Sequence, residues 1–272
     1  MKKIFNILLV FVLIFSFSVS VSAITGREVM EKVNQEEAVE STHGLLGMDL
    51  IDAEGNVKSR TLEIWSITRG EADLMNMVME FRAPASVAGT RFLMIENKDR
   101  DDDQHIYLPS LGRVRRISSS QEDSAFMGSD FTYSDMSQLQ SSDIDDDSHK
   151  LLKEEILGDY ECYVIESTPK NPEDSNYGRR IQWISKKHLM PVKVEMYNKK
   201  TGKLEKILTV KQNIAKIDGH WTPFWGKIEN LETSHSTVLY VKRSDSGAAF
   251  IEYNKKINPN RFTPNFLKTG KF

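Results

Sequence analysis

The sequence predicts a mainly β protein of the α+β class, with a strongly curved antiparallel sheet of about eleven strands that forms a half-open barrel and has one or more helices covering its mouth. Three observations predict this fold. Apolar residues recur with a period of two in many short runs, turn residues separate the runs, and a helical period is confined mainly to the start. Because twist accumulates across so many strands, the sheet must curl, and its concave face becomes a hollow.

The first residues are typical of a secretory signal peptide. Met1-Lys2-Lys3 is positively charged, residues 4–21 carry no charge, and Val21-Ser22-Ala23 offers the compact residues that signal peptidase reads. We expect cleavage after Ala23 and a single mature domain over residues 24–272. A retained membrane anchor is the alternative, because a spanning helix needs about 20 apolar residues.

A capping box begins the mature chain. Thr25 and Glu28 can each satisfy a free amide at a helix start, and Val29 and Val33 then give a short helix its apolar face. From Leu46 onwards the period changes to two. Residues 46–50 and 61–68 flank a Gly-Asn turn and are expected to pair as a hairpin.

Further strands follow in two groups. We expect them at residues 77–82, 91–96 and 104–108 in the first half, and at 160–168, 180–185, 192–198, 204–214, 224–231 and 237–242 in the second half. A long irregular segment over 112–147, with a helical turn near 133–139, separates the two groups. The tail, with Pro259 and Pro264, is expected to be irregular or to cover a sheet edge.

Several strands have large apolar side chains on both faces. Leu62 and Ile64 alternate with Trp65 and Ile67, so a helix or an apolar ligand must cover the second face. Methionines within the strands suit an adaptable wall, since their side chains repack easily. The residues expected to line a lipid-binding hollow are Trp65, Met77, Met79, Phe81, Phe92, Met94, Trp183 and Met196. An ordinary packed core is the alternative interpretation of the same residues.

Composition and spacing exclude several classes of function. Loss of Lys2 and Lys3 with the signal peptide changes the formal net charge from −3 to about −5, so no basic stripe for nucleic acid is expected. Cys162, the only cysteine, cannot form an internal disulfide, and its apolar neighbours favour a small buried residue over a catalytic one. The histidines lack metal-ligand spacing, and the acidic turn near Asp101 lacks the Gly and Glu of a calcium loop, so we expect no metal and no cofactor.

Two stretches in the middle of the chain carry a family resemblance. They are Tyr-Leu-Pro-Ser-Leu-Gly-Arg-Val-Arg-Arg-Ile at 107–117 and Phe-Met-Gly-Ser-Asp-Phe-Thr-Tyr-Ser-Asp-Met at 126–136. They resemble the outer-membrane lipoprotein-sorting family of bacteria, the LolA/LolB-like periplasmic carriers of the type associated with RND/MMPL exporters. Further matches lie at Pro84 with 89–93, at 162–166, at 183–184 with 190–193, and at 221–223.

The resemblance implies a periplasmic half-barrel, closed by helices, that binds lipid or lipoprotein acyl chains in its hollow. We therefore expect a non-enzymatic carrier for outer-membrane lipoprotein or lipid sorting, with an RND-type exporter as a partner and an unidentified outer-membrane acceptor. The Arg-aromatic lid motif of the better-known carrier has no counterpart here by residue, so the resemblance extends to fold and ligand class.

The same two stretches contain the residues expected to contact a lipid headgroup or a partner. The arginines can pair with phosphate, and a strand edge kept from aggregation by charge is the alternative interpretation. The Gly128-Ser129-Asp130 turn can orient the flanking phenylalanines, contact an exporter, or do both. The expected contact residues are Arg113, Arg115, Arg116, Phe126, Asp130 and Phe131.

Two other functions stay open at this point. An exporter adaptor that carries no cargo predicts a packed core and an exposed apolar patch near residues 126–136. A hydrolase acting on lipid or glycan predicts carboxylates that converge in a cleft with perturbed pKa values.

Overall fold

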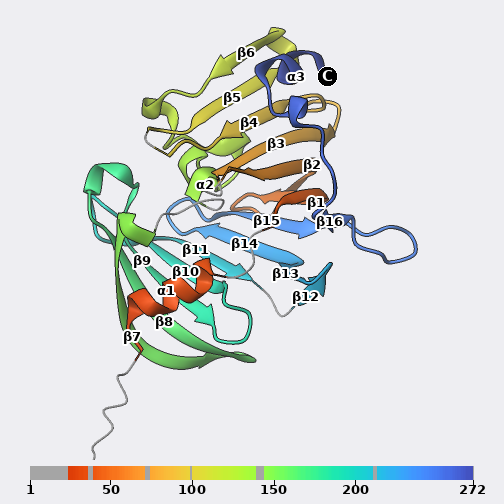
Figure 1. Cartoon of the computed structure of the whole chain (residues 1–272). Helices are drawn as coiled ribbons and strands as arrows, with labels where there is room; N and C mark the ends of the chain where they lie inside the picture. Colours follow the sequence, from red (N-terminus) through yellow and green to blue (C-terminus); the bar gives the residue numbers. More distant parts are fainter. Residues whose placement is uncertain are drawn as a thin grey trace, which may run out of the picture.

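One large antiparallel sheet dominates the structure, a computed structural model that describes residues 24–35, 39–70, 74–98, 100–138, 144–210 and 213–271. Fourteen strands of the described chain form this sheet, in the order β6-β5-β4-β3-β2-β1-β15-β14-β11-β10-β9-β8-β7, with β16 also paired to β1. The two edge strands, β6 and β7, lie at opposite ends of the molecule (Figure 1) and do not pair. The sheet is therefore open, and the predicted half-open, mainly β fold is confirmed with more strands than the expected eleven.

The bounds of the strands show a meander in each half of the sheet. The first half contains β1 (Ser41–Ile51), β2 (Val57–Arg69), β3 (Leu74–Ala83), β4 (Arg91–Ile95), β5 (Asp103–Leu108) and β6 (Arg113–Arg116). The second half contains β7 (Asp147–Leu157), β8 (Tyr160–Pro169), β9 (Tyr177–Ser185), β10 (Pro191–Asn198), β11 (Leu204–Val210), β14 (Trp225–Asn230) and β15 (His235–Val241). The short strand β16 (Ile251–Tyr253) pairs with β1, and β12 (Ile214–Ile217) and β13 (His220–Pro223) form a separate hairpin.

Three α-helices accompany the sheet in the described residues. They are α1 (Gly26–Asn34), α2 (Tyr133–Gln138) and α3 (Pro264–Thr269). The capping box of α1 is confirmed, because Glu28 N–H donates to Thr25 Oγ1 at 3.2 Å and Thr25 N–H donates to the Glu28 carboxylate at 2.7 Å. Helix α2 confirms the helical turn expected near 133–139. Short 3₁₀ turns lie at η1 (Pro109–Leu111), η2 (Ser119–Gln121), η3 (Phe126–Gly128), η4 (Ile144–Asp146), η5 (Pro172–Asp174) and η6 (Pro259–Arg261).

Neither edge strand was predicted: β6 lies inside the segment that was expected to be irregular, and β7 begins at the last residue of that segment, Asp147. Strand β6 has the sequence Arg-Val-Arg-Arg, and β7 carries a charge at five of its residues from Asp147 to Glu155. Charged side chains protect an exposed sheet edge from pairing with other chains, and they also hide the apolar alternation that identifies a strand. The expectation of an irregular segment over 112–147 was therefore wrong at 113–116, and the strand over 147–157 was missed.

Two further expectations are corrected near the end of the chain. The single strand expected over 204–214 is two strands, since β11 ends at Val210 and β12 begins at Ile214 in the separate hairpin. The tail forms α3 instead of staying irregular, and this helix lies on the outer face of β4, β5 and the edge strand β6. Its Phe266 and Leu267 pack against Val78 and Leu93 there.

The register of the strands gives the sheet two apolar faces in its first half. Leu62 pairs with Phe81, and Met79 pairs with Phe92, so these side chains share the concave face. Trp65 pairs with Val78 on the outer face under α3. The predicted apolar covering of both faces is therefore present.

No helix in the described ranges has the length and hydrophobicity needed to cross a bilayer. The predicted signal peptide, residues 1–23, lies outside the described residues.

Candidate functional site

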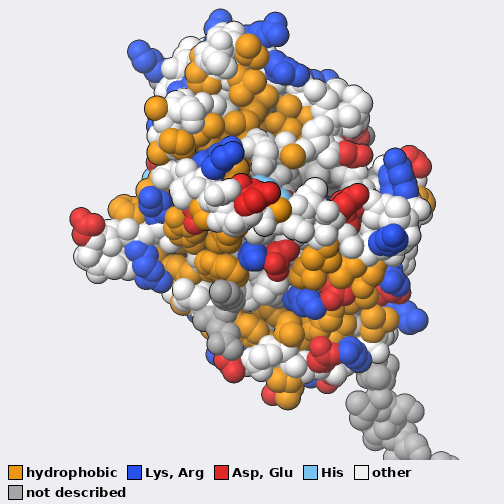
Figure 2. Space-filling view, turned by 180° about the vertical axis from the view of Figure 1, so that it is seen from behind, with side chains coloured by type: hydrophobic (Ala, Val, Ile, Leu, Met, Phe, Trp, Pro, Cys, Tyr) orange, Lys and Arg blue, Asp and Glu red, His pale blue; other side chains and the backbone are white. Residues whose placement is uncertain are grey.

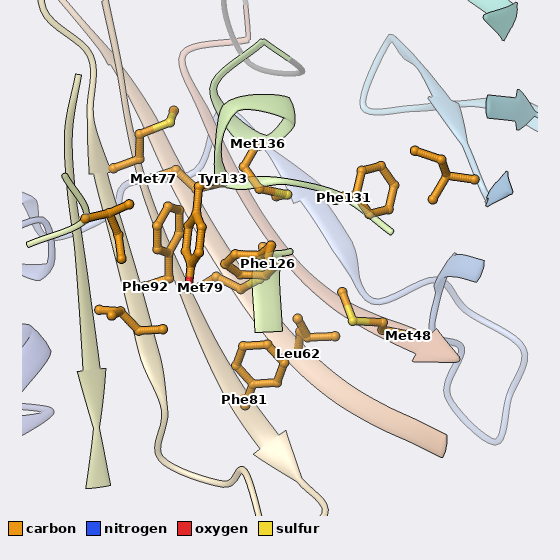
Figure 3. Close-up of a cluster of buried hydrophobic side chains, with 14 of the residues drawn as sticks. Met48, Leu62, Met77, Met79, Phe81, Phe92, Phe126, Phe131, Tyr133 and Met136 are labelled. Atoms are coloured by element: carbon orange, nitrogen blue, oxygen red, sulfur yellow. The ribbon is translucent and has the colours of Figure 1, made fainter. Parts of the chain in front are cut away.

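A segment of the chain itself fills the concave face of the first half. We call residues 126–136 the plug. Phe126 is fully buried, with its ring centroid 5.1 Å from that of Phe92 and 5.4 Å from that of Tyr133, both in edge-to-face geometry. Figure 3 shows Phe126, Tyr133 and Met136 pointing toward the side chains of β2 to β4. Aromatic contacts of this kind add to the free energy of burial, so the plug is part of the hydrophobic core.

The plug holds its shape through local backbone bonds. Phe126 N–H donates to the Phe131 carbonyl at 2.7 Å, and Ser129 Oγ donates to the Phe126 carbonyl at 2.7 Å. Met127 and Gly128 both have positive φ angles, 51° and 75°. Glycine adopts this conformation without steric cost, which explains its place in the turn.

Asp130 ties the plug to β15. Its carboxylate accepts from Thr237 Oγ1 at 2.7 Å and lies 2.8 Å from His235 Nδ1, and its own N–H donates to Thr237 Oγ1 at 2.9 Å. Asp130 is buried, so its expected role as a headgroup or partner contact is corrected. The carboxylate instead bonds to the partly buried His235 and the buried Thr237, which lie 105 and 107 residues further along the chain.

Replacing Asp130 with alanine is expected to lower the free energy of unfolding by about 1–3 kcal/mol, because the buried Thr237 hydroxyl loses its acceptor. Urea denaturation measures the change. The control is Asp245→Ala, at an exposed loop position, with an expected effect within about 0.5 kcal/mol. Equal stabilities of the two variants would contradict the anchoring role of Asp130.

A second anchor lies at the start of α2. Asp135 accepts from the Tyr177 hydroxyl at 3.0 Å and from Lys206 Nζ at 3.3 Å. It also forms a reciprocal cap with Thr132, whose N–H donates to the carboxylate at 2.8 Å. Burial, followed by the charge of Asp135, raises the pKa of Tyr177 well above its ordinary value. The hydroxyl therefore keeps its proton and donates to Asp135.

A cavity of about 250 Å³ lies on the concave face of the second half, between α1, the plug and the sheet. Its volume is close to the lower end of the range for small-molecule sites, about 300–1,000 Å³. Apolar side chains make up most of its wall, namely Met30, Val33, Phe131, Ile144, Ile184, Pro191, Val194, Met196, Leu208 and Ile228. Polar side chains complete it, namely Asn34, Asp135, Asp147, His149, Tyr177, Arg180 and Gln182.

Helix α1 forms one wall of this cavity, and it packs against β7 to β9. Val29 is fully buried against Ile165 and Ile184. Gly26 lies so close to β7 that an added Cβ would approach the Leu151 amide to 2.6 Å. An ion pair between Arg27 and Asp145, 2.8 Å long, ties the exposed side of the helix to η4. These contacts fix α1 over the concave face (Figure 1).

Cross-strand register separates the polar wall from the apolar wall. His149, Ser167, Arg180, Met196 and Lys206 follow one another across β7 to β11 in one row. The next row contains Leu151, Ile165, Gln182, Val194, Leu208 and Ile228. The cavity thus has a polar margin beside an apolar floor.

The residues expected to line the hollow divide into three sets. Met196 lines the cavity. The side chains of β3 and β4 face the same concave side, but they pack against the plug, and these are Met77, Met79, Phe81, Phe92 and Met94. For these five the packed-core interpretation describes the structure.

Trp65 and Trp183 lie on the outer face of the sheet, so their assignment to the hollow is corrected. Trp65 packs under Arg261, whose guanidinium is 4.0 Å from the ring centroid. Trp183 lies in a cluster with Cys162 and Val192, and its Nε1 donates to Glu155 at 3.0 Å. Alternation within one strand does not reveal which of its two faces is concave, and the pairing with neighbouring strands decides it.

The outer face of the second half has an apolar groove that α3 does not reach. Leu157, Tyr160, Val192, Val210 and Trp225 line this open groove of about 780 Å³. Apolar side chains gather among charged ones in the lower half of the view from behind (Figure 2), where β7 to β11 lie. Cys162 is buried beside Val192, a residue of this groove. Burial raises the pKa of the Cys162 thiol to about 11, so the thiol stays protonated and unreactive at neutral pH.

The residues that were expected to contact a headgroup or a partner fall into an exposed set and a buried set. Arg113, Arg115 and Arg116 are exposed on the edge strand β6, and Arg116 pairs with Asp103 at 3.2 Å. This exposed position on a sheet edge fits both the charged-edge interpretation and the pairing with phosphate, which stays a prediction. Phe126 and Phe131 are buried in the plug, so neither offers a surface to a partner.

Sequence reasoning missed most of the cavity wall. Val194, Leu208 and Ile228 belong to predicted strands, and their alternation is visible, but no local signal marks them as facing a void. Arg180 and Gln182 were missed because polar residues in a strand ordinarily face water. Their partly buried position results from α1 and the plug, which lie far away in the sequence.

Comparisons with known proteins identify relatives of this chain by sequence and by fold. A family model described as an uncharacterised protein matches residues 73–269. A DUF1329 family protein from Desulfovibrio piger has a TM-score of 0.80 and 28% identity, over 89% of this chain and 97% of that chain. No curated protein matches the chain significantly.

Two further solved structures are similar to this chain. A domain from Vibrio parahaemolyticus proposed to be an outer membrane lipoprotein-sorting protein has a TM-score of 0.78 and 30% identity, over 89% of this chain and 98% of that chain. A LolA superfamily protein from Nitrosomonas europaea shares the fold, with a TM-score of 0.65 and 20% identity over 90% of this chain and 100% of that chain. The chain therefore belongs to the same family as the Vibrio parahaemolyticus outer-membrane lipoprotein-sorting domain, as its motifs predict, and it shares its fold with the LolA superfamily protein.

Proposed function

We propose that this protein is a periplasmic carrier that binds lipid or lipoprotein acyl chains in the cavity between α1, the plug and β7 to β14. The observation that carries this proposal is the apolar cavity of about 250 Å³ on the concave face of a LolA-like sheet. Burial of each methylene group there contributes about 0.8 kcal/mol relative to water, so the cavity offsets the cost of exposing an acyl chain to water between two membranes.

The carrier would work in outer-membrane lipoprotein or lipid sorting, with an RND-type exporter as a partner. The family resemblance and the predicted signal peptide support this placement. The mature domain would extend over 24–272, with no catalysis and no cofactor.

The cargo-free exporter adaptor is less well supported. That hypothesis predicts an exposed apolar patch near residues 126–136, whereas the apolar anchors of the plug, Phe126, Phe131, Tyr133 and Met136, are buried. The cavity in the second half also has no role in an adaptor that binds no cargo.

Native mass spectrometry of the mature protein purified from bacterial cells tests the carrier. We expect a bound species that organic solvent releases and that lipid analysis identifies as acylated. A clean apo mass, with no binding of the uncharged fluorescent probe N-phenylnaphthylamine, would overturn the proposal.

A pair of adjacent substitutions locates the site. Leu208→Trp is expected to fill the cavity and weaken probe binding by about tenfold or more, because the added ring occupies the apolar floor. The matched control is Ile207→Trp, on the same strand and the opposite face, with unchanged binding. Circular dichroism confirms that both variants fold. Equal probe affinities in the two variants would place binding elsewhere.

A further inference from the structure

Two segments of the chain carry charge of one sign only. Residues 104–121 and 253–271 together contain eight Lys and Arg and no Asp or Glu, whereas the remainder of the chain has 28 Lys and Arg against 39 Asp and Glu. Charges of both signs are ordinarily interspersed on a protein surface. The separation therefore draws attention to the place where the two segments meet.

The fold brings these segments together at the end of the molecule opposite α1 and β7 (Figure 1). Helix α3 packs on β4, β5 and β6, and Arg91 of β4 donates from Nη1 to the Leu267 carbonyl of α3 at 3.0 Å. In the view from behind, Lys and Arg side chains lie at this upper end, and the visible Asp and Glu side chains lie lower (Figure 2). One end of an acidic protein is therefore basic.

Four cations at this end lack a carboxylate partner. Each is exposed, and no carboxylate in the described part of the chain lies within ion-pair distance of any of them, namely Arg113, Arg115, Lys268 and Lys271. Arg116, the next cation along β6, differs because it pairs with Asp103 at 3.2 Å. The four charges are thus available to an anion outside the protein.

The register of β6 places these cations on both sides of the sheet edge. Arg113 pairs with Leu108 and Arg115 pairs with Ile106, and both partners pack in the concave core. The two arginines therefore extend on the concave side of β6. The two lysines belong to α3 and the residues after it, on the outer side of the same strand.

An exposed apolar side chain lies at the tip of the hairpin between β5 and β6. Leu111 is the last residue of the 3₁₀ turn η1, and its side chain is 49% exposed. Gly112 closes the turn with a φ of 60°, and its N–H donates to the Leu108 carbonyl at 3.0 Å. We call Leu111 and the four unpaired cations the basic tip.

We propose that the basic tip docks on the surface of a membrane that contains anionic phospholipid. Guanidinium and ammonium groups pair with lipid phosphates, and each cation near an anionic bilayer strengthens binding by about fivefold. An exposed leucine among such cations can enter the boundary between headgroups and acyl chains. Protection of the sheet edge explains the charges of β6 but not Lys268 and Lys271, which belong to another element.

Docking through the basic tip leaves the opposite end of the molecule, with α1 and the cavity, accessible to a partner (Figure 1). The inference concerns a surface outside the cavity. It does not depend on the carrier function proposed above.

Flotation titrations of the mature wild-type protein with two kinds of vesicle test the docking. One kind consists of phosphatidylcholine, and in the other phosphatidylglycerol replaces about one third of it. We expect binding to the anionic vesicles to be at least about tenfold tighter. The preference should disappear in about 0.5 M NaCl, where the screening length falls to about 4 Å.

A quadruple variant locates the docking surface. Arg113→Gln/Arg115→Gln/Lys268→Gln/Lys271→Gln is expected to weaken binding to the anionic vesicles by about tenfold or more. The matched control has the same net charge and changes four exposed lysines of the second half, as Lys170→Gln/Lys199→Gln/Lys200→Gln/Lys203→Gln. Equal losses in the two variants would show that net charge, and not the basic tip, governs binding.

A pair of leucine substitutions tests the apolar contact. Leu111→Asn is expected to weaken binding to the anionic vesicles by about threefold or more, because the leucine no longer enters the interface. The control is Leu231→Asn, at a position that is 48% exposed in the turn after β14, with unchanged binding. Equal affinities of the two variants would overturn the membrane contact of Leu111.

The outcomes separate this inference from the carrier function. Equal binding to the two kinds of vesicle, or binding to neither, would overturn docking on an anionic membrane, and binding to neither would favour an acidic protein as the partner of the basic tip. The quadruple variant should bind N-phenylnaphthylamine as the wild type does, since the basic tip and the cavity lie at opposite ends. Absence of probe binding in the wild type bears on the carrier alone.

Discussion

Phe126→Ala is expected to lower the free energy of unfolding by about 3–5 kcal/mol, the range for removal of a large aromatic side chain from a core. Phe126 is fully buried and its ring meets those of Phe81, Phe92 and Tyr133. Its truncation leaves a void between the plug and β3 to β4 that a close-packed core cannot fill without strain. The energy is lost because the ring's dispersion contacts and its burial are lost together.

Guanidinium denaturation of Phe126→Ala and of a matched control measures this effect. Phe250→Ala removes the same side chain at a position that is 48% exposed, so its expected change is below about 1 kcal/mol. If the two variants lose similar stability, the plug does not contribute to the core as the structure indicates. The comparison also shows whether residues 126–136 are part of the cooperative unit.

Asp135→Asn is the second substitution with a large expected effect, again about 3–5 kcal/mol, because it leaves the ammonium of Lys206 buried without its carboxylate. Lys206→Met should cost less. Without Lys206, the Asp135 carboxylate still accepts from the Tyr177 hydroxyl and the Thr132 amide. The double variant should therefore lose less stability than the sum of the two single variants.

A double-mutant cycle followed by urea denaturation gives the coupling free energy of the pair. The control is Glu229→Gln, which removes a surface carboxylate 2.7 Å from Lys227 and is expected to cost about 0–1 kcal/mol. Strict additivity of Asp135→Asn and Lys206→Met would mean that the two side chains do not interact. A large coupling would establish that α2 is held to β11 by a buried ion pair.

The sequence predicted those elements whose signal is local. The capping box of Thr25 and Glu28 identified α1, because both partners lie within one helical turn. The alternation of Leu62 and Ile64 with Trp65 identified a strand with two apolar faces. The edge strands β6 and β7 escaped prediction, since an exposed edge is charged and does not alternate cleanly.

The site was predicted less completely than the fold, and the reason is visible in individual residues. Met196 and Met79 look alike in the sequence, as methionines within alternating strands. Met196 lines the cavity, whereas Met79 packs against the plug. Nothing in either strand encodes this difference, because it depends on where residues 126–136 lie.

What the sequence by itself determined is the fold class, the family resemblance, the capped first helix and the two-faced character of the strands. All of these rest on residue types, motifs or spacings within a short stretch of chain. The tertiary structure decided which concave surface is filled and which is hollow. That choice depends on contacts such as Asp130 with Thr237, which are 107 residues apart, and on the register that brings Arg180, Met196 and Lys206 into one row. Burial of a polar side chain beside an apolar floor arises only when these distant segments meet.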